Sequence, residues 1–102
     1  MNYVTLDFSG IKSLWTLHEY FKEIFQLPEY YGHNMDALWD CLLYYFETPT
    51  TIVLKNIRKI PAEMSEAVET MLALFNELQQ QDENITIQIE PDLNDDISPF
   101  QV

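Results

Sequence analysis

Three short runs of apolar and β-branched residues stand far apart along the chain, with helical patterns between them. The runs cover residues 3–8, 50–54 and 85–89, and each is typical of a β-strand. The stretches that separate them hold apolar residues at spacings of three and four, the pattern of amphipathic helices. Because parallel strands need long crossover connections, this order predicts an α/β fold with a small three-stranded parallel sheet covered by helices.

The first connection should begin with a helix that faces the core along one stripe. Ser13 is a typical N-cap for it, and Thr16 with Glu19 offers a competing capping box about one turn later. The helix should end near Gln26, because the residue before the following proline is biased away from helix. Trp15 adjoins the apolar stripe and is expected in the core or at its boundary, whereas His18 is expected at the surface or the boundary. The stripe that we expect to be buried consists of Leu14, Leu17, Phe21, Ile24 and Phe25.

The remaining helices complete the order β-α-α-β-(short α)-α-β. Asn34 is a strong N-cap for the second helix, which Pro49 should end. A turn of helix is expected within residues 55–61, before a last helix from about residue 61 or 65 to residue 80. The core stripe of the second helix is expected to consist of Met35, Leu38, Leu42, and Tyr45 or Phe46.

A chain of 102 residues is long enough for one domain with a hydrophobic core and too short for two. We expect residues 1–90 to form this domain and residues 91–102 to form an acidic C-terminal tail. Cys41 is the only cysteine, which favours a reducing cytoplasm. The sequence shows no signal-peptide pattern and no apolar run near the roughly 20 residues that span a bilayer. We therefore expect a cytoplasmic protein that does not enter membranes.

The charge balance narrows the class of partner. The chain has 17 Asp and Glu against 5 Lys and Arg, a formal net charge of -12. Such a field repels nucleic acids and anionic membranes and attracts cationic proteins. Direct binding to nucleic acid would need clustered basic residues, yet no Lys or Arg falls between Lys22 and Lys55. The expected partner is a basic protein.

The stretch from residue 27 to residue 40 has features that a purely structural role does not require. Tyr30 and Tyr31 are expected side by side in an exposed loop, where large rings contribute little to stability. Asp36 and Asp40 lie four residues apart on the second helix, where like charges repel by a few tenths of a kcal/mol. The helix dipole favours Asp36 in the first turn but not Asp40. Aromatic residues beside an unneutralised carboxylate are typical of a binding surface for a basic partner.

Catalytic chemistry has weaker support in the sequence. A metal site could be drawn from Glu29, His33, Asp36 and Asp40, but it lacks the second histidine and the fixed spacing of catalytic zinc or iron sites. Cys41 falls beside a core stripe, where a thiol is inert. Gly10 and Gly32 are the only glycines, so there is no glycine-rich phosphate loop. We expect no catalytic residue, no metal and no cofactor.

The same stretch resembles the signature of the barstar family of ribonuclease inhibitors. The resemblance extends more weakly over residues 3–90, and its strongest part is Leu27-Pro28-Glu29-Tyr30-Tyr31-Gly32, then Asn34, then Asp36-Ala37-Leu38-Trp39-Asp40. It implies a compact, non-enzymatic α/β inhibitor that enters a ribonuclease active site with its second helix and the preceding loop. Asp40 would stand where an RNA phosphate binds, Asp36 would add a second negative charge, and Glu77 would be a further acidic contact.

Five positions depart from the family pattern as the resemblance gives it. Leu43, Tyr44 and Tyr45 replace a threonine, a glycine and a tryptophan, while His33 and Gln81 each replace an acid. We expect the first three residues to influence the choice of partner. The candidate contact residues are Tyr30, Tyr31, Gly32, Asn34, Asp36, Trp39, Asp40, Leu43, Tyr44, Tyr45, Glu47 and Glu77.

The partner implied is a barnase-like microbial ribonuclease, bound by a chain that is monomeric when free. Two other functions stay open. The chain could be an immunity or regulatory protein that binds a different basic toxin or a cytoplasmic protein through the same surface. It could also be a small metal-dependent hydrolase that uses His33, Asp36 and Asp40.

Overall fold

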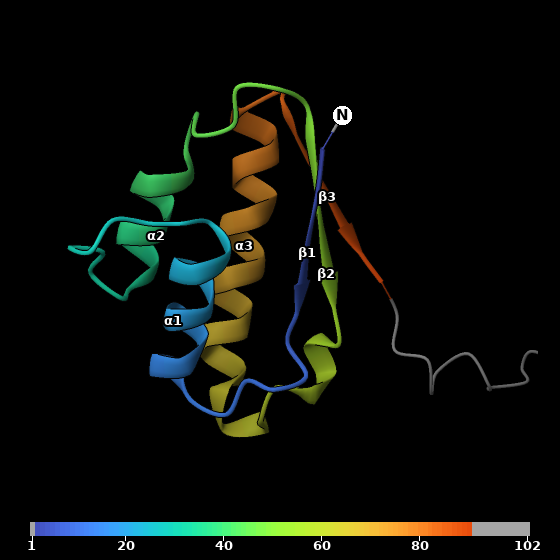
Figure 1. Ribbon diagram of the computed structural model, residues 1–102. Coiled ribbons are helices and arrows are strands. Elements are labelled where there is room, and N and C mark those ends of the chain that lie inside the picture. The colour runs from blue at the N-terminus through green and yellow to red at the C-terminus, as the bar shows by residue number, and fades with distance from the viewer. Residues whose placement is uncertain (1, 91–102) are drawn as a thin grey trace, which may run out of the picture.

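The computed structural model describes residues 2–90, and the expected tail of residues 91–102 lies outside the described residues (Figure 1). Its strands are β1 (Asn2–Asp7), β2 (Thr50–Lys55) and β3 (Ile85–Ile89). They form one parallel sheet in the order β1-β2-β3. The α/β fold with three parallel strands is therefore confirmed.

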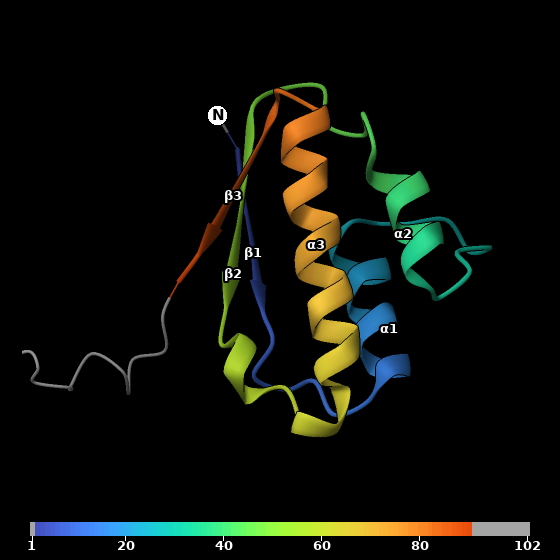
Figure 2. The same ribbon diagram turned by 180° about the vertical axis from the view of Figure 1, so that it is seen from behind.

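The helices fill the two crossovers in the predicted order. The first crossover holds α1 (Leu14–Ile24) and α2 (Met35–Leu42), and the second holds the short 3-10 helices η1 (Ile57–Lys59) and η2 (Ala62–Met64), followed by α3 (Ser65–Gln81). Figure 1 and the reverse view in Figure 2 show α1, α2 and α3 on the same side of the sheet. Among residues 2–90, no helix is both long enough and apolar enough to cross a membrane.

Both predicted N-caps are confirmed. The hydroxyl oxygen of Ser13 accepts a hydrogen bond from the backbone N–H of Thr16 at 3.1 Å. The side-chain oxygen of Asn34 accepts one from the backbone N–H of Ala37 at 2.8 Å. Each cap satisfies a helix donor that would otherwise be unpaired, which stabilises a helix by about 1 kcal/mol. The second cap fixes the residue at which α2 begins.

The core lies between the sheet and the helices. At its centre Phe21 meets Phe8 and Phe75 edge to face, with ring centroids 6.4 Å and 6.2 Å apart. All three rings are fully buried, and truncating one such ring to alanine costs about 3–5 kcal/mol. The other fully buried apolar side chains are Leu6, Leu17, Leu38, Leu42, Ile52, Leu54, Met71 and Leu78.

The buried face of α1 differs from its predicted stripe. Leu14 is 51% exposed and Ile24 is 38% exposed, because they lie in the first and last turns, where fewer neighbours cover a side chain. Trp15 is 63% exposed, so its expected place in the core or at its boundary is wrong. His18 is 1% exposed, so the prediction of a surface or boundary histidine is also wrong.

The second helix is shorter than predicted. It ends at Leu42, well before Pro49, because Leu43 is extended and Tyr44 has a left-handed φ of 58°. Neither conformation continues an α-helix. Of the two side chains offered as the end of the core stripe, Phe46 packs against the core and Tyr45 is exposed.

Candidate functional site

The helix α2 presents two carboxylates to solvent from a firmly anchored backbone. Asp36 and Asp40 are exposed, while Leu38 and Leu42 on the opposite face are fully buried. No hydrogen bond or ion pair joins either carboxylate to another residue within the described part of the chain. Their charge is therefore left uncompensated, which suits a cationic partner.

The loop before α2 sends its two adjacent tyrosines in opposite directions. Tyr30 is 86% exposed, as predicted, but Tyr31 is only 4% exposed, so its expected exposure is wrong. The hydroxyl of Tyr31 lies 2.7 Å from Nδ1 of His18 in the interior. Burial raises the pKa of the Tyr31 hydroxyl and lowers the pKa of His18. Both groups therefore stay neutral, and the Tyr31 hydroxyl can donate to the imidazole. Tyr31 shapes the loop from inside, and Tyr30 is its exposed ring.

Gly32 lets the loop pass close to the start of α2. A Cβ at this position would lie 3.3 Å from Nδ2 of Asn34 and 3.5 Å from Cβ of Ala37. The same Nδ2 donates to the carbonyl oxygen of Gly32 at 3.1 Å. Asn34 therefore holds both the loop and the first turn of α2, and a side chain at Gly32 would press on it.

A groove runs between α2 and α3 beside the exposed aspartates. Its volume is about 370 Å³, and its lining residues are Met35, Asp36, Trp39, Thr70, Ala73, Leu74 and Glu77. Three predicted contact residues, Asp36, Trp39 and Glu77, thus line the same groove. The groove has acids but no Lys or Arg among its lining residues. Sequence reasoning missed Thr70 and Ala73, although both lie on the face of α3 that carries Glu77, at helical spacing from it.

The segment that follows α2 adds two exposed aromatic rings to the surface. Tyr44 is 67% exposed and Tyr45 is 45% exposed, while Leu43 is half-buried. The Tyr45 hydroxyl donates to the carbonyl oxygen of Phe25 at 2.8 Å, which ties this segment to the end of α1. Glu47 is exposed but does not line the groove.

The metal site drawn from the sequence has no counterpart in the described residues. Within residues 2–90, no group of three or more His, Cys, Asp or Glu side chains is placed to hold a metal ion. Glu29 pairs with Lys22 at 3.4 Å, and His33 pairs with Glu19. These two side chains are thus directed to α1 and not to Asp36 and Asp40.

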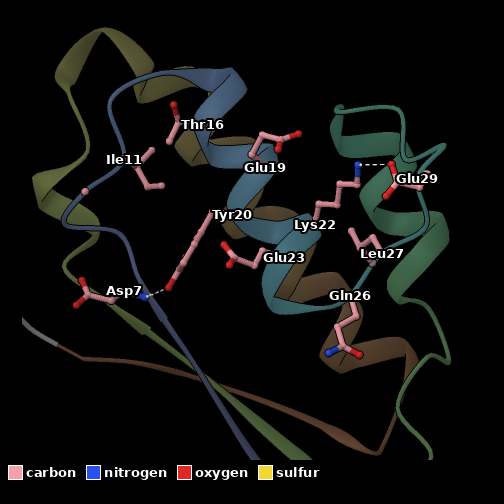
Figure 3. A pocket seen from close by; sticks show the side chains of 11 residues that line it. Asp7, Ile11, Thr16, Glu19, Tyr20, Lys22, Glu23, Gln26, Leu27 and Glu29 are labelled. Atoms are coloured by element: carbon pink, nitrogen blue, oxygen red, sulfur yellow. Dashed lines mark hydrogen bonds and ion pairs between the residues drawn. The ribbon is translucent and has the colours of Figure 1, made fainter.

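A larger hollow of about 630 Å³ lies along α1 and shares no lining residue with the groove (Figure 3). The hydroxyl oxygen of Tyr20 accepts a hydrogen bond there from the backbone N–H of Asp7 at 2.8 Å. The Lys22–Glu29 ion pair closes another side of it. None of the predicted contact residues lines this hollow.

Comparisons with known proteins show the family of the chain. The sequence matches the family model described as "Barstar (barnase inhibitor)" over residues 1–92. It is also 32% identical over 81 residues to a protein of Bacillus subtilis (strain 168) named "Putative ribonuclease inhibitor YrdF". That alignment covers 79% of this chain and 89% of the relative. The chain therefore belongs to the barstar family.

Proposed function

We propose that this protein inhibits a ribonuclease by placing the carboxylates of α2 in the enzyme's phosphate-binding site. The observation that carries the proposal is the pair Asp36 and Asp40, which are exposed and unpaired within the described residues on a rigid helix. A ribonuclease must gather basic groups to bind the RNA backbone. A carboxylate aimed at those groups competes directly with a substrate phosphate.

The surroundings of the two aspartates supply the rest of a contact surface. Tyr30 offers an exposed ring from the loop, and Trp39 lines the groove beside Asp36. Exposed aromatic residues near the centre of an interface contribute strongly to affinity because they bury large area at low entropic cost. Glu77 extends the negative surface onto α3. The protein acts as a binding partner and not as an enzyme, and it is monomeric when free.

The overall charge favours fast encounter. A formal net charge of -12 attracts a basic enzyme over distances beyond contact, and such steering raises association rates by about 10 to 10³ at low salt. Added salt screens the attraction. Association with the ribonuclease should therefore slow steeply as ionic strength rises, while dissociation changes little.

The test is inhibition of a guanyl-specific microbial ribonuclease by Asp40→Asn and by the parent protein. Removal of a central charged contact should weaken inhibition by at least about 30-fold, the equivalent of about 2 kcal/mol. Glu63→Gln, on η2, makes the same change in net charge away from α2 and serves as the matched control. Equal inhibition by parent and Asp40→Asn, or none by either at micromolar concentration, would contradict the proposal.

A second candidate keeps this surface and changes the partner to another basic toxin or a basic cytoplasmic protein. The exposed rings of Tyr44 and Tyr45 favour it, because they enlarge the surface next to α2. Capture experiments with the parent and with Asp40→Asn as baits separate the two candidates. A basic protein without ribonuclease activity that binds only the parent would support the second candidate.

A further inference from the structure

The strand β3 forms one edge of the sheet, so another strand pairs with it only on its β2 side (Figure 1). The N–H of Glu90, which directly follows β3, donates to the carbonyl oxygen of Leu54 in β2 at 3.0 Å. Because successive residues of a strand alternate in direction, the N–H groups of Ile85, Ile87 and Ile89 point away from β2. Outward N–H groups at the edge of a sheet are a template for pairing with a strand of another chain.

The chain itself covers two of these three outward donors. The N–H of Ile85 donates to the carbonyl oxygen of Asp82 in the preceding turn at 3.0 Å. The N–H of Ile87, in the middle of β3, donates to Oε1 of the Gln79 side chain on α3 at 3.0 Å. Within residues 2–90, the outward N–H of Ile89 has no such partner. Gln79 therefore occupies the central donor that an added strand would need.

A second hydrogen bond orients the side chain of Gln79 for this contact. Its Nε2 donates to Oδ1 of Asn76, which lies three residues earlier on α3, at 3.3 Å. A side-chain amide has donors on its nitrogen and an acceptor on its oxygen, so the bond to Asn76 leaves the oxygen for the strand. Gln79 is also half-buried. Its position is therefore set by the packing of α3 on the sheet as well as by the two hydrogen bonds.

The sequence of β3 favours pairing with an identical strand. It reads Ile-Thr-Ile-Gln-Ile, without charge or proline, a composition typical of segments that associate as β-strands. The side chain of Ile89 is 57% exposed at its end. In an antiparallel pair, two residues directly opposite each other exchange both N–H···O bonds. Ile87 of one chain would therefore pair with Ile87 of a second copy about a two-fold axis, through the same N–H that Gln79 covers.

We propose that Gln79 is an edge cap that prevents β3 from pairing with β3 of a second copy of this chain. The side-chain amide takes the place of the incoming strand at Ile87 and leaves only the last outward donor of β3 open. The net charge of -12 also opposes self-association, but salt screens that repulsion. The cap does not depend on long-range charge. It acts in the free protein and is independent of the proposed inhibition.

The cap is tested first by amide hydrogen exchange of Gln79→Met, which keeps the length of the side chain and removes the acceptor. The reference is the N–H of Thr50, which donates from β2 to Asn84 at 2.8 Å. At a concentration where the proteins are monomeric, the exchange rate of Ile87 relative to Thr50 should rise about fivefold, as expected for the loss of one hydrogen bond. Gln79→Glu keeps an acceptor and should retain the ratio of the parent. An unchanged ratio in Gln79→Met would overturn the cap.

Self-association is then measured by sedimentation velocity at micromolar to millimolar concentration, in high salt that screens the repulsion between chains. The parent should stay monomeric, whereas Gln79→Met should form dimers or larger species. Gln80→Met makes the same substitution at the next residue of α3, which is exposed, and should behave as the parent does. Equal behaviour of the parent and Gln79→Met would overturn the role of Gln79 in preventing self-association.

A double variant shows whether the association uses β3. A lysine at the edge of a sheet disfavours strand pairing, and Ile89 is exposed enough to accept one. Gln79→Met with Ile89→Lys should therefore return to the monomer. The added lysine lowers the net negative charge, so charge repulsion cannot account for this result. Self-association that persists in the double variant would overturn the assignment of the contact to β3.

Discussion

The hydroxyl of Tyr31 and Nδ1 of His18 lie 2.7 Å apart in the interior, where each is the other's polar partner. The two residues belong to different segments, the loop before α2 and the middle of α1. Their hydrogen bond therefore ties the loop before α2 to the core. The ring of the neighbouring Tyr30 is exposed, so two identical adjacent residues lie in opposite environments.

The two tyrosines should respond differently to substitution. Tyr31→Phe removes the hydroxyl and leaves Nδ1 of His18 buried without a partner, which should lower the free energy of unfolding by about 1–3 kcal/mol. Tyr30→Ala should change it by less than about 0.5 kcal/mol, as exposed sites do, while weakening ribonuclease inhibition. Urea unfolding and inhibition assays on both variants check this. Equal loss of stability in the two would contradict it.

Acid should destabilise the fold through His18. Burial lowers the pKa of this residue from its ordinary 6.5. Below pH 6.5, His18 is therefore protonated more readily in the unfolded chain than in the folded chain. The stabilisation is fully present above pH 6.5 and is lost as pH falls toward the lowered pKa. Urea unfolding at about pH 7.5 and about pH 5.5 measures it. The variant His18→Gln should flatten the dependence.

Replacing Tyr44 by glycine should affect both the stability of the fold and the choice of partner. The left-handed φ of 58° at Tyr44 costs a residue with a side chain about 1–2 kcal/mol, which glycine avoids. The greater freedom of glycine in the unfolded chain offsets part of this gain. Tyr44→Gly should therefore raise the free energy of unfolding by up to about 1 kcal/mol. The same variant should bind a barnase-like ribonuclease more tightly, because the exposed ring is gone. A loss of both stability and affinity would contradict this account.

We expect a chain that ends at Glu90 to keep its inhibitory activity. The proposed contact residues all precede this point, and the removed segment contributes three aspartates and no basic residue. The association rate at low salt should fall modestly because less negative charge steers the encounter, whereas the dissociation rate should not change. Stopped-flow kinetics at two salt concentrations check this. A changed dissociation rate would show that residues 91–102 contact the partner.

Patterns of nearest neighbours along the chain were enough to predict the strands, their parallel arrangement and both N-caps. Ser13 and Asn34 succeed as predictions because a cap acts on N–H groups only three residues away. His18 and Tyr31 fail because their burial depends on a hydrogen bond between segments that only the folded chain brings together. The predicted end of α2 is wrong because the left-handed backbone at Tyr44, which follows the helix, has no glycine to mark it. For the candidate site, the residues came from the family resemblance, whereas the groove between α2 and α3 required the structure.

The placement of α1 and α2 within a single crossover has an evolutionary consequence. Nearly all of the proposed recognition surface lies between the end of β1 and the start of β2, with Glu77 as the exception on α3. The sheet and α3 can therefore be kept as a frame while the β1–β2 segment diverges. Relatives with other targets could arise by exchange of this β1–β2 segment alone. A chimaera that swaps residues 8–49 between two relatives should also swap the partners that they bind.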